Sequence, residues 1–521
     1  MPKILQVTGL GSKGLNSDLP SVDLDTGYIT SGNNFRVSNG SIESIVGTSL
    51  LTSGAGSFNA AKLMSVKTSS AAFLMVMGKT AVKVFDGTTW STITSAAGYA
   101  SLGTDDELLW TSCLLGAIPI INNFQHVPEY WSPQNGATIL KPLQFDAGNT
   151  WVAKSYKTKV IRAHGQYLFA LNLKEGASEL PDSFRWSHPA DINGLPFTWD
   201  ETDLSAVAGK SSVGGDTGAI VDGLTLRDSF IIYSEKGITS LSLSGDEFIW
   251  RKTTISNSNG LAAQDAIVEI GGRHYFLSSD ADIMVNDGVN IKSIVHNKIR
   301  RAILDSVSWN YIDRSYAFKH LSTKEIWFCI PTNSSTLPNT AFVYNCVNDD
   351  WSIRSIPSNI SHIAYANKPT TELTYTTVTG TYSSTTLKYS DSSYVLETPL
   401  CVDRSNGNVY SIDDISAVNS PVDTAIERIN YPLEGIEQAA TILKIYPKFS
   451  GSGTVKISIG SHDFPGSPIR WQPSIDFIIG TNRKIEVRTT GILHAWKIES
   501  NTTNIWKFQG MDIEYELAGL R

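Results

Sequence analysis

Nine histidines are the residues of this chain best suited to hold a metal ion or to transfer a proton: His126, His164, His188, His274, His296, His320, His362, His462 and His494. Histidine metal sites often use two ligands at a short spacing, as in His-Xaa-His or His-Glu-Xaa-Xaa-His. These histidines are dispersed and show no such spacing. The sequence therefore predicts no metal site.

Glycine- and acid-rich segments are the next candidates, for phosphate or calcium. Gly209-Lys210-Ser211 lacks the glycine five residues before Lys210 that a phosphate-binding loop requires. The acids of 278–282 and 286–288 lack the spacing of a calcium loop that closes on a distal glutamate. The nucleophile-elbow and dinucleotide fingerprints are missing as well. We interpret these segments as turns and predict no cofactor.

Paired carboxylates could hydrolyse a glycosidic bond if the fold held them at a fixed separation. Asp86-Gly87-Thr88-Thr89-Trp90 resembles the aspartate-box turn of sialidases, but Asp86 and Gly87 are adjacent and Val84 replaces a serine or threonine. The acids of 105–107 and 349–350 cannot be paired across space from sequence, and we expect solvated turn acids. No catalytic residue is predicted, and the chain is expected not to be an enzyme. A carbohydrate-binding or glycan-degrading propeller is the alternative.

Charge and cysteine content exclude further classes. With 42 Lys and Arg against 50 Asp and Glu, the net charge of −8 disfavours tight nucleic-acid binding. The basic cluster in the short predicted helix 298–304 is interpreted as a solvated face or an interface rather than a nucleic-acid patch. Cys113, Cys329, Cys346 and Cys401 have no Cys-Xaa-Xaa-Cys spacing, so we expect buried free thiols.

A membrane anchor is not expected. The longest apolar run, 114–121, contains Pro119 and is shorter than the ~18 residues of a spanning helix. Residues 1–7 lack the long apolar stretch of a signal peptide. Synthesis and folding in a cytoplasm are the default expectation.

Short apolar and aromatic runs alternate with Gly, Asn, Asp and Ser turns, and this pattern predicts strands. Any functional site would therefore be held by strands and the loops between them. Residues 72–93 predict three antiparallel strands joined by hairpin turns, one of them at Asp86-Gly87. One pattern recurs along the chain: a predicted strand, then a turn, then a second strand that usually begins at a tryptophan. Approximate markers of this repeat are Trp90, Gly136, Trp199, Trp250, Asn290, Trp351 and Asn408.

These markers are about 40 to 63 residues apart, as expected for propeller blades of four strands. We predict an all-β fold, a propeller of about six blades followed by a C-terminal β-sandwich, with an array of β-sandwiches as the alternative. The expected domains are an extended arm at 1–34, a propeller at 35–430 and a sandwich at 431–521. A Tyr/Thr-rich insertion falls near 367–395. The arm has little core potential and could lie over a neighbouring subunit.

Three groups of residues carry a resemblance to a known family. The first comprises 14–20, 33–43 and Gly47; the second 326–331, 342–345 and 350–352; the third 444–448, 453–460, 469–471, 484–491 and 510–515 with Gly519 and Arg521. Together they resemble the tail nozzle proteins, also called hub or tail tubular proteins, of short-tailed bacteriophages (podoviruses). The similarity spans nearly the whole chain, and its motifs are structural rather than catalytic.

The resemblance implies a structural virion protein of the phage tail, made in the host cytoplasm. It implies a propeller with accessory β domains, assembled as a homohexamer around the DNA exit channel. The ring would lie below the adaptor (head-to-tail connector) and carry fibres or spikes. Genomic DNA would pass without specific binding. The net charge of −8 agrees with this role, because phosphate contacts would add friction to the moving DNA.

Overall fold

The computed structural model describes residues 2–68, 71–99, 102–192, 194–244, 249–369, 397–415, 419–435 and 437–518. Within these ranges nearly all regular structure is strand. Helical turns are short: α1 (Trp151–Lys154), α2 (Arg300–Ser306), and the 3-10 turns η1 (Asp106–Leu109), η2 (Pro133–Asn135), η3 (Gly215–Thr217) and η4 (Trp309–Arg314). The predicted all-β fold class is confirmed. Most of the Tyr/Thr-rich insertion, 370–395, lies outside the described residues.

Seven antiparallel sheets of four strands make up most of the chain. Each sheet is written here from its inner to its outer strand. Blade 1 is β8 (Ala60–Lys67), β9 (Ala72–Gly78), β10 (Val82–Phe85) and β11 (Trp90–Thr92); blade 2 is β12 (Thr111–Leu115), β13 (Ile118–Asn122), β14 (Glu129–Tyr130) and β15 (Lys141–Pro142); blade 3 is β16 (Tyr156–His164), β17 (Tyr167–Glu175), β18 (Ser178–Trp186) and β19 (Gly209–Ser212). Blade 4 is β20 (Ile220–Leu226), β21 (Ser229–Ser234), β22 (Ile238–Leu243) and β23 (Trp250–Ser256); blade 5 is β24 (Ile267–Ile270), β25 (Arg273–Leu277), β26 (Ile283–Asn286) and β27 (Ile291–Ser293). Blade 6 is β28 (Tyr316–His320), β29 (Glu325–Ile330), β30 (Thr340–Asn345) and β31 (Asp350–Ser355); blade 7 is β32 (Ile360–Asn367), β33 (Glu397–Asp403), β34 (Val409–Ile412) and β7 (Thr48–Thr52).

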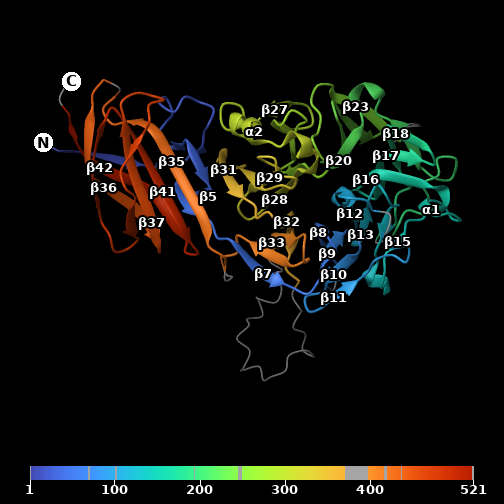
Figure 1. Cartoon of the computed structure of the whole chain (residues 1–521). Coiled ribbons are helices and arrows are strands. Elements are labelled where there is room, and N and C mark those ends of the chain that lie inside the picture. Colours follow the sequence, from blue (N-terminus) through green and yellow to red (C-terminus); the bar gives the residue numbers. More distant parts are fainter. Residues whose placement is uncertain are drawn as a thin grey trace.

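The inner strands of the blades form a closed ring. From β12 to β32, each inner strand contacts the inner strand of the next blade, and β32 contacts β8. The gap between β8 and β12 is bridged by η1 and by Lys62, whose Nζ donates to the Trp110 carbonyl at 3.3 Å. Four-stranded sheets arranged around an axis define a β-propeller (Figure 1).

Blade 7 is built from both ends of the propeller sequence. β7 pairs with β34, from Thr48 opposite Ile412 to Thr52 opposite Val409. The predicted number of about six blades is therefore one lower than the seven four-stranded sheets of the described residues. A count of consecutive repeats misses a blade whose outer strand lies more than 300 residues before the other three.

Two six-stranded sheets form a second unit, the terminal module. The first sheet contains β1 (Lys3–Thr8), β5 (Phe35–Ser38), β6 (Ser41–Ser44), β36 (Ala440–Gly451), β40 (Ile485–Gly491) and β42 (Trp506–Leu517). The second contains β4 (Ser31–Asn33), β35 (Val422–Pro432), β37 (Thr454–His462), β38 (Arg470–Trp471), β39 (Ile475–Ile478) and β41 (Leu493–Thr502). Ile445 and Ile513 of the first sheet share one apolar core with Ile457 and Ile498 of the second.

The N-terminal residues belong to this module, which differs from the expected boundaries at 34 and 430. β1 pairs with β42, β4 pairs with β35, and β35 begins at Val422. Period-two alternation in residues 35–44 fits a blade and a sandwich equally well, so the sequence could not choose between them. Figure 1 shows this module at one end of the molecule, beside blades 6 and 7.

The segment expected as an arm is packed on its own chain. Leu10, Leu15 and Ile29 are buried, and β2 (Gly14–Leu15) pairs with β3 (Tyr28–Ile29). Gly14 has φ +77°, and a Cβ there would lie 2.7 Å from the Trp351 carbonyl oxygen. The glycine thus lets the segment lie directly against β31.

Candidate functional site

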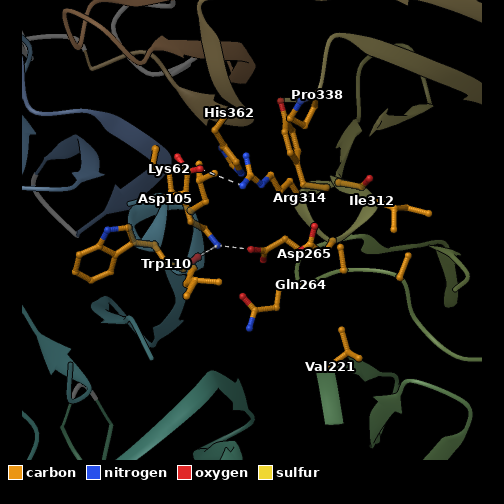
Figure 2. Close-up of a pocket in the computed structure, with 18 of the residues that line it drawn as sticks. Lys62, Asp105, Trp110, Val221, Gln264, Asp265, Ile312, Arg314, Pro338 and His362 are labelled. Carbon is orange, nitrogen blue, oxygen red and sulfur yellow. Dashed lines mark hydrogen bonds and ion pairs between the residues drawn. The ribbon is translucent and has the colours of Figure 1, made fainter. Parts of the chain in front are cut away.

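A cavity lies on the axis of the propeller, where the inner strands begin. Its volume is about 450 Å³, and every blade contributes to its wall (Figure 2). Representatives of blades 1 to 7 in order are Lys62, Trp110, Lys159, Val221, Asp265, Tyr316 and His362. Convergence of all blades on one small hollow makes this cavity the candidate functional site.

A layer of four charged side chains closes the axis beneath the cavity. Lys62 Nζ lies 2.5 Å from Asp265 Oδ2, and Arg162 Nη2 donates to Asp265 Oδ1 at 2.8 Å. Arg162 also forms a two-point ion pair with Asp222, at 2.8 Å from Nε and 2.7 Å from Nη2. Four different blades supply these groups, so the layer spans the ring.

Burial and ion pairing act in opposite directions on the charged layer. Asp222 is 0 % exposed, and Arg162 and Lys62 are each 7 % exposed. Burial opposes ionisation of Asp265, but the charges of Lys62 and Arg162 outweigh it and lower the pKa of this carboxyl. Burial likewise opposes the charge of Arg162, and Asp222 and Asp265 reverse the effect and raise its pKa. Burial lowers the pKa of Lys62, an effect that Asp265 partly offsets.

A second, more open hollow of about 860 Å³ lies on the other side of this layer. Its lining includes Thr225, Glu269 and Lys319, and it shares Lys62, Asp265 and His362 with the axial cavity. The two hollows are thus separated by the ion pairs.

Acids that the sequence predicted as solvated line one wall of the cavity. Asp105 accepts from Arg404 at 2.8 Å and from Arg314 at 3.1 Å, as Figure 2 shows for Arg314. The hydrogen bond from Arg404 is the main reason that the pKa of Asp105 is lowered. Glu107 is 1 % exposed and also accepts from Arg404, at 2.6 Å. Only part of this acidic turn is therefore solvated.

The other acidic turn also differs from expectation. Asp349 is exposed and pairs with Lys298 at 2.6 Å. Asp350 is 4 % exposed, and its Oδ2 has no hydrogen-bond partner within the described residues. Burial raises the pKa of Asp350 to about 7.

Neutral polar groups complete the cavity. Ser315 and Gln264 both line it, and His362 stacks on Tyr316 with ring centroids 4.5 Å apart. His362 Nδ1 accepts a long hydrogen bond from the Leu63 amide at 3.5 Å, which leaves the proton on Nε2. Burial lowers the pKa of His362 to about 3, so the ring is neutral at physiological pH.

The other residues that could carry chemistry do not form a cluster. In the described part of the chain no group of three His, Cys, Asp or Glu side chains could hold a metal ion. All four cysteines are free; Cys329 and Cys401 are buried as predicted, whereas Cys113 and Cys346 are only partly buried. Burial raises the pKa of Cys113 to about 12 and that of Cys346 to about 11, so neither is a thiolate near neutral pH.

Sequence reasoning missed the residues of the charged layer, although a signal was present. Lys62, Arg162 and Asp222 each stand alone between apolar residues of a strand: Ala-Ala-Lys-Leu, Val-Ile-Arg-Ala and Ile-Val-Asp-Gly. A single charge in a buried strand needs a partner. Three such strands predict an internal ion-pair network without predicting which charges pair.

A second buried network joins the propeller to the terminal module. Arg36 of β5 lies 2.5 Å from Glu325 of β29 and also binds Asp413. Arg354 lies 3.3 Å from Asp413, and its guanidinium stacks 4.4 Å from the Trp327 ring centroid. Burial opposes ionisation of Glu325, but the arginines prevail and lower its pKa to about 2.

Comparisons with known proteins give no family. No protein-family model and no curated protein matches the sequence. Among solved structures, YCF48 from Cyanidioschyzon merolae is 10 % identical with a TM-score of 0.36, over 70 % of this chain and 98 % of that one. PorZ, a surface component of the type-IX secretion system of Porphyromonas gingivalis, is 11 % identical with a TM-score of 0.33, over 84 % and 46 %. The CNH domain of AfRom2 is 10 % identical with a TM-score of 0.37, over 70 % and 99 %.

The sheet topology itself, rather than these distant likenesses, defines the chain as a β-propeller with an attached β module. In the described ranges, no helix has the length and apolar character needed to cross a bilayer.

Proposed function

We propose that this chain is a structural virion protein that forms the tail nozzle of a short-tailed phage. Six copies surround the DNA exit channel, attach below the adaptor ring and support fibres or spikes. In each copy the two sheets of the terminal module act as a β-sandwich. The family resemblance of the sequence motifs is the starting point of this proposal.

The observation that carries the proposal is that ion pairs make the propeller one rigid block. The layer of Lys62, Arg162, Asp222 and Asp265 links four of its blades, and a second buried ion network fixes it to the terminal module. Such a block suits the wall of a channel. DNA would then pass between copies and not through a propeller.

Charge and surface composition support the same role. A net charge of −8 per chain avoids phosphate contacts that would retain DNA. Several large apolar side chains are exposed in the single chain, including Leu204, Ile192, Val289, Val347 and Phe464. Contacts with other copies, the adaptor or fibres would remove such side chains from water.

The test is assembly on particles. Chain produced with its neighbouring virion proteins is expected to give a six-fold ring below the adaptor in electron cryomicroscopy of purified tails. Tails that contain the chain without six-fold density at that position would refute the proposal. The matched control is particles made without this chain, which should lack the ring and leak DNA.

The alternative, a carbohydrate-active propeller, has one observation in its favour, which is the axial cavity. Degradation would need two carboxyl groups available to substrate. Asp105 and Asp265 are held by arginine and lysine, which leaves Asp106, Asp313 and Glu235 as the other acids of the lining. Release of reducing sugar from host surface glycans, abolished by replacing one acid of the cavity, would favour this alternative.

A further inference from the structure

The long loop between β18 and β19 of blade 3 exposes large apolar side chains to solvent. Within its described residues, 187–192 and 194–208, Leu204 is fully exposed, Ile192 is 86 % exposed and Phe197 is half exposed. We call this segment the blade-3 loop. Exposed apolar side chains gathered in one short segment are typical of protein contact sites.

The blade-3 loop is also acidic. Its sequence contains neither lysine nor arginine. Its four acids are Asp191, Asp200, Glu201 and Asp203. Glu201 pairs with Arg185, whereas the other three acids form no ion pair within the described residues. The surface that complements this loop is therefore apolar and positively charged.

The terminal module has a second surface with exposed apolar side chains. Phe464, Trp471 and Ile478 are exposed on β38, on β39 and in the turn before β38. Trp471 and Ile469 pack over Gly460 of β37, where a Cβ would lie 3.0 Å from the Trp471 ring and 2.5 Å from Ile469. Together with β40, which contacts β37, these strands form a surface that we call the module edge.

The module edge carries a net positive charge. Two of its ion pairs are internal, Asp463 with Arg470 at 2.9 Å and Glu486 with Lys484 at 2.6 Å. The other Lys, Arg, Asp and Glu side chains of 452–490 form no ion pair within the described residues; they are Lys456, Arg483, Arg488 and Asp476. Three unpaired cations against one unpaired acid complement the acids of the blade-3 loop.

The two surfaces lie at opposite ends of the molecule. β4 and β5, the last strands of the two sheets of the module, contact β31 of the propeller, whereas β38 and β40 are the first strands of the same sheets. The module edge therefore faces away from the propeller. Blade 3 lies at the other end, where Trp199 of the loop packs on Trp151 of α1 with ring centroids 5.1 Å apart (Figure 1). Complementary surfaces at opposite ends of one chain allow a head-to-tail contact between copies, and such contacts can close into a ring.

We infer that the blade-3 loop of one copy docks on the module edge of the next copy, so that copies associate head to tail. In this contact the exposed apolar side chains of both surfaces leave water, and the unpaired acids of the loop meet the unpaired cations of the edge. The inference rests on the proposed nozzle for the closure of the ring, and it deepens that proposal by naming the surfaces that join the copies.

Sedimentation velocity of the full chain tests the contact with two variants, each of which blocks one surface. Leu204→Lys gives the blade-3 loop a charge of the same sign as the module edge, and Ile478→Glu gives the edge a charge of the same sign as the loop. Each variant alone should associate at least about tenfold more weakly than the native chain. An equimolar mixture should form a 1:1 dimer and nothing larger, because only one intact loop and one intact edge remain to pair.

Val289→Lys is the matched control, because Val289 is 79 % exposed in the turn between β26 and β27 of blade 5, outside both surfaces. This variant should associate like the native chain. Thermal unfolding of all three variants checks that the fold is intact, as expected for substitutions at exposed side chains.

The inference is wrong if the native chain stays monomeric up to about 100 μM, if either folded blocking variant associates like the native chain, or if their mixture stays monomeric. Tails whose six-fold ring forms equally well with both blocking variants would refute the contact and leave the nozzle proposal intact. Head-to-tail association in solution, together with tails that lack six-fold density, would refute the nozzle proposal alone.

Discussion

The stability of the propeller depends on individual buried charged residues, and Asp222 is an example. Asp222 is fully occupied as an acceptor in the axial layer: it accepts from Arg162 twice, from the Gly223 amide at 2.7 Å and from the Asp265 amide at 2.8 Å. A buried ion pair contributes little net stability, but removing one partner leaves the other charge uncompensated. The layer is therefore a point at which one substitution has a large effect.

We predict that Asp222→Asn destabilises the chain by roughly 3–5 kcal/mol, because the amide cannot compensate the charge of Arg162. Chemical denaturation measures this change. Glu179→Gln is the matched control, since Glu179 forms an exposed ion pair with Lys174 at 2.9 Å and such pairs contribute about 0–1 kcal/mol. Equal stabilities of the two variants would contradict the assigned role of the layer.

Asp350 gives a prediction with a defined pH dependence. Its pKa is about 7 in the folded chain, raised mainly by burial, whereas an unfolded aspartate titrates near 3.8. The folded state thus holds a proton that the unfolded state releases between these values. The stability contributed by the protonated carboxyl is complete below pH ~3.8 and is lost as pH rises through about 7.

Asp350→Asn should therefore change the free energy of unfolding in a pH-dependent way. The change should be more stabilising at pH 8 than at pH 5, by about 1–3 kcal/mol. Melting temperatures of both proteins across this range provide the measurement. A difference between the proteins that stays constant with pH would show that Asp350 titrates normally.

At the scale of strands, β7 decides whether the propeller is closed. It supplies the outer strand of blade 7 and pairs with β34 from Thr48 to Thr52. Leu50 lies opposite Tyr410 and is 55 % exposed, so its side chain contributes little to the core. We therefore expect Leu50 to contribute to blade 7 through the backbone pairing of β7 with β34.

Leu50→Pro places a proline in a paired strand, where its ring and fixed φ disturb the pairing, and should destabilise the chain by roughly 1 kcal/mol or more. Hydrogen exchange should accelerate in β34 first, because that strand loses its partner. Leu50→Thr keeps the backbone donor and is the control. Unchanged exchange in β34 of the proline variant would show that the closure is not required.

The blade strands themselves were predictable from the sequence, whereas their assembly was only partly so. The hairpins of 72–93 follow from alternation and from Asp86-Gly87. The assignment of residues 35–44 was wrong because local alternation does not record which distant strand is the partner. The pairing of Lys62 with Asp265 escaped notice for the same reason, since only closure of the ring brings these two residues together.

For the whole molecule, the N-terminal strands act as ties between its two units. β1 completes the first sheet of the terminal module, and Asp18 caps α2 of the propeller by accepting from the amides of Arg300 and Arg301 at 3.0 and 2.9 Å. Deletion of 8–32 would consequently remove buried Leu10, Leu15 and Ile29. The segment is part of the fold and not a dispensable arm.

Removal of residues 2–8 should lower stability and cause self-association, since it exposes the edge of β42 that β1 covers. Light scattering and thermal unfolding measure both effects. Ile4→Thr, at a side chain that is 62 % exposed, keeps the strand and serves as control. A truncated chain that melts and elutes like the native one would refute the prediction.

The pairing of the first strands with the last also constrains the order in which the protein can form. During synthesis, β1 leaves the ribosome about 500 residues before β42, and β7 precedes β34 by more than 350. Neither early strand has its partner until translation is almost complete. The middle blades can fold as they emerge, while β1 and β7 wait as unpaired strands. A chain that stops between β34 and β42 could close the propeller, but its strand β1 would have no partner.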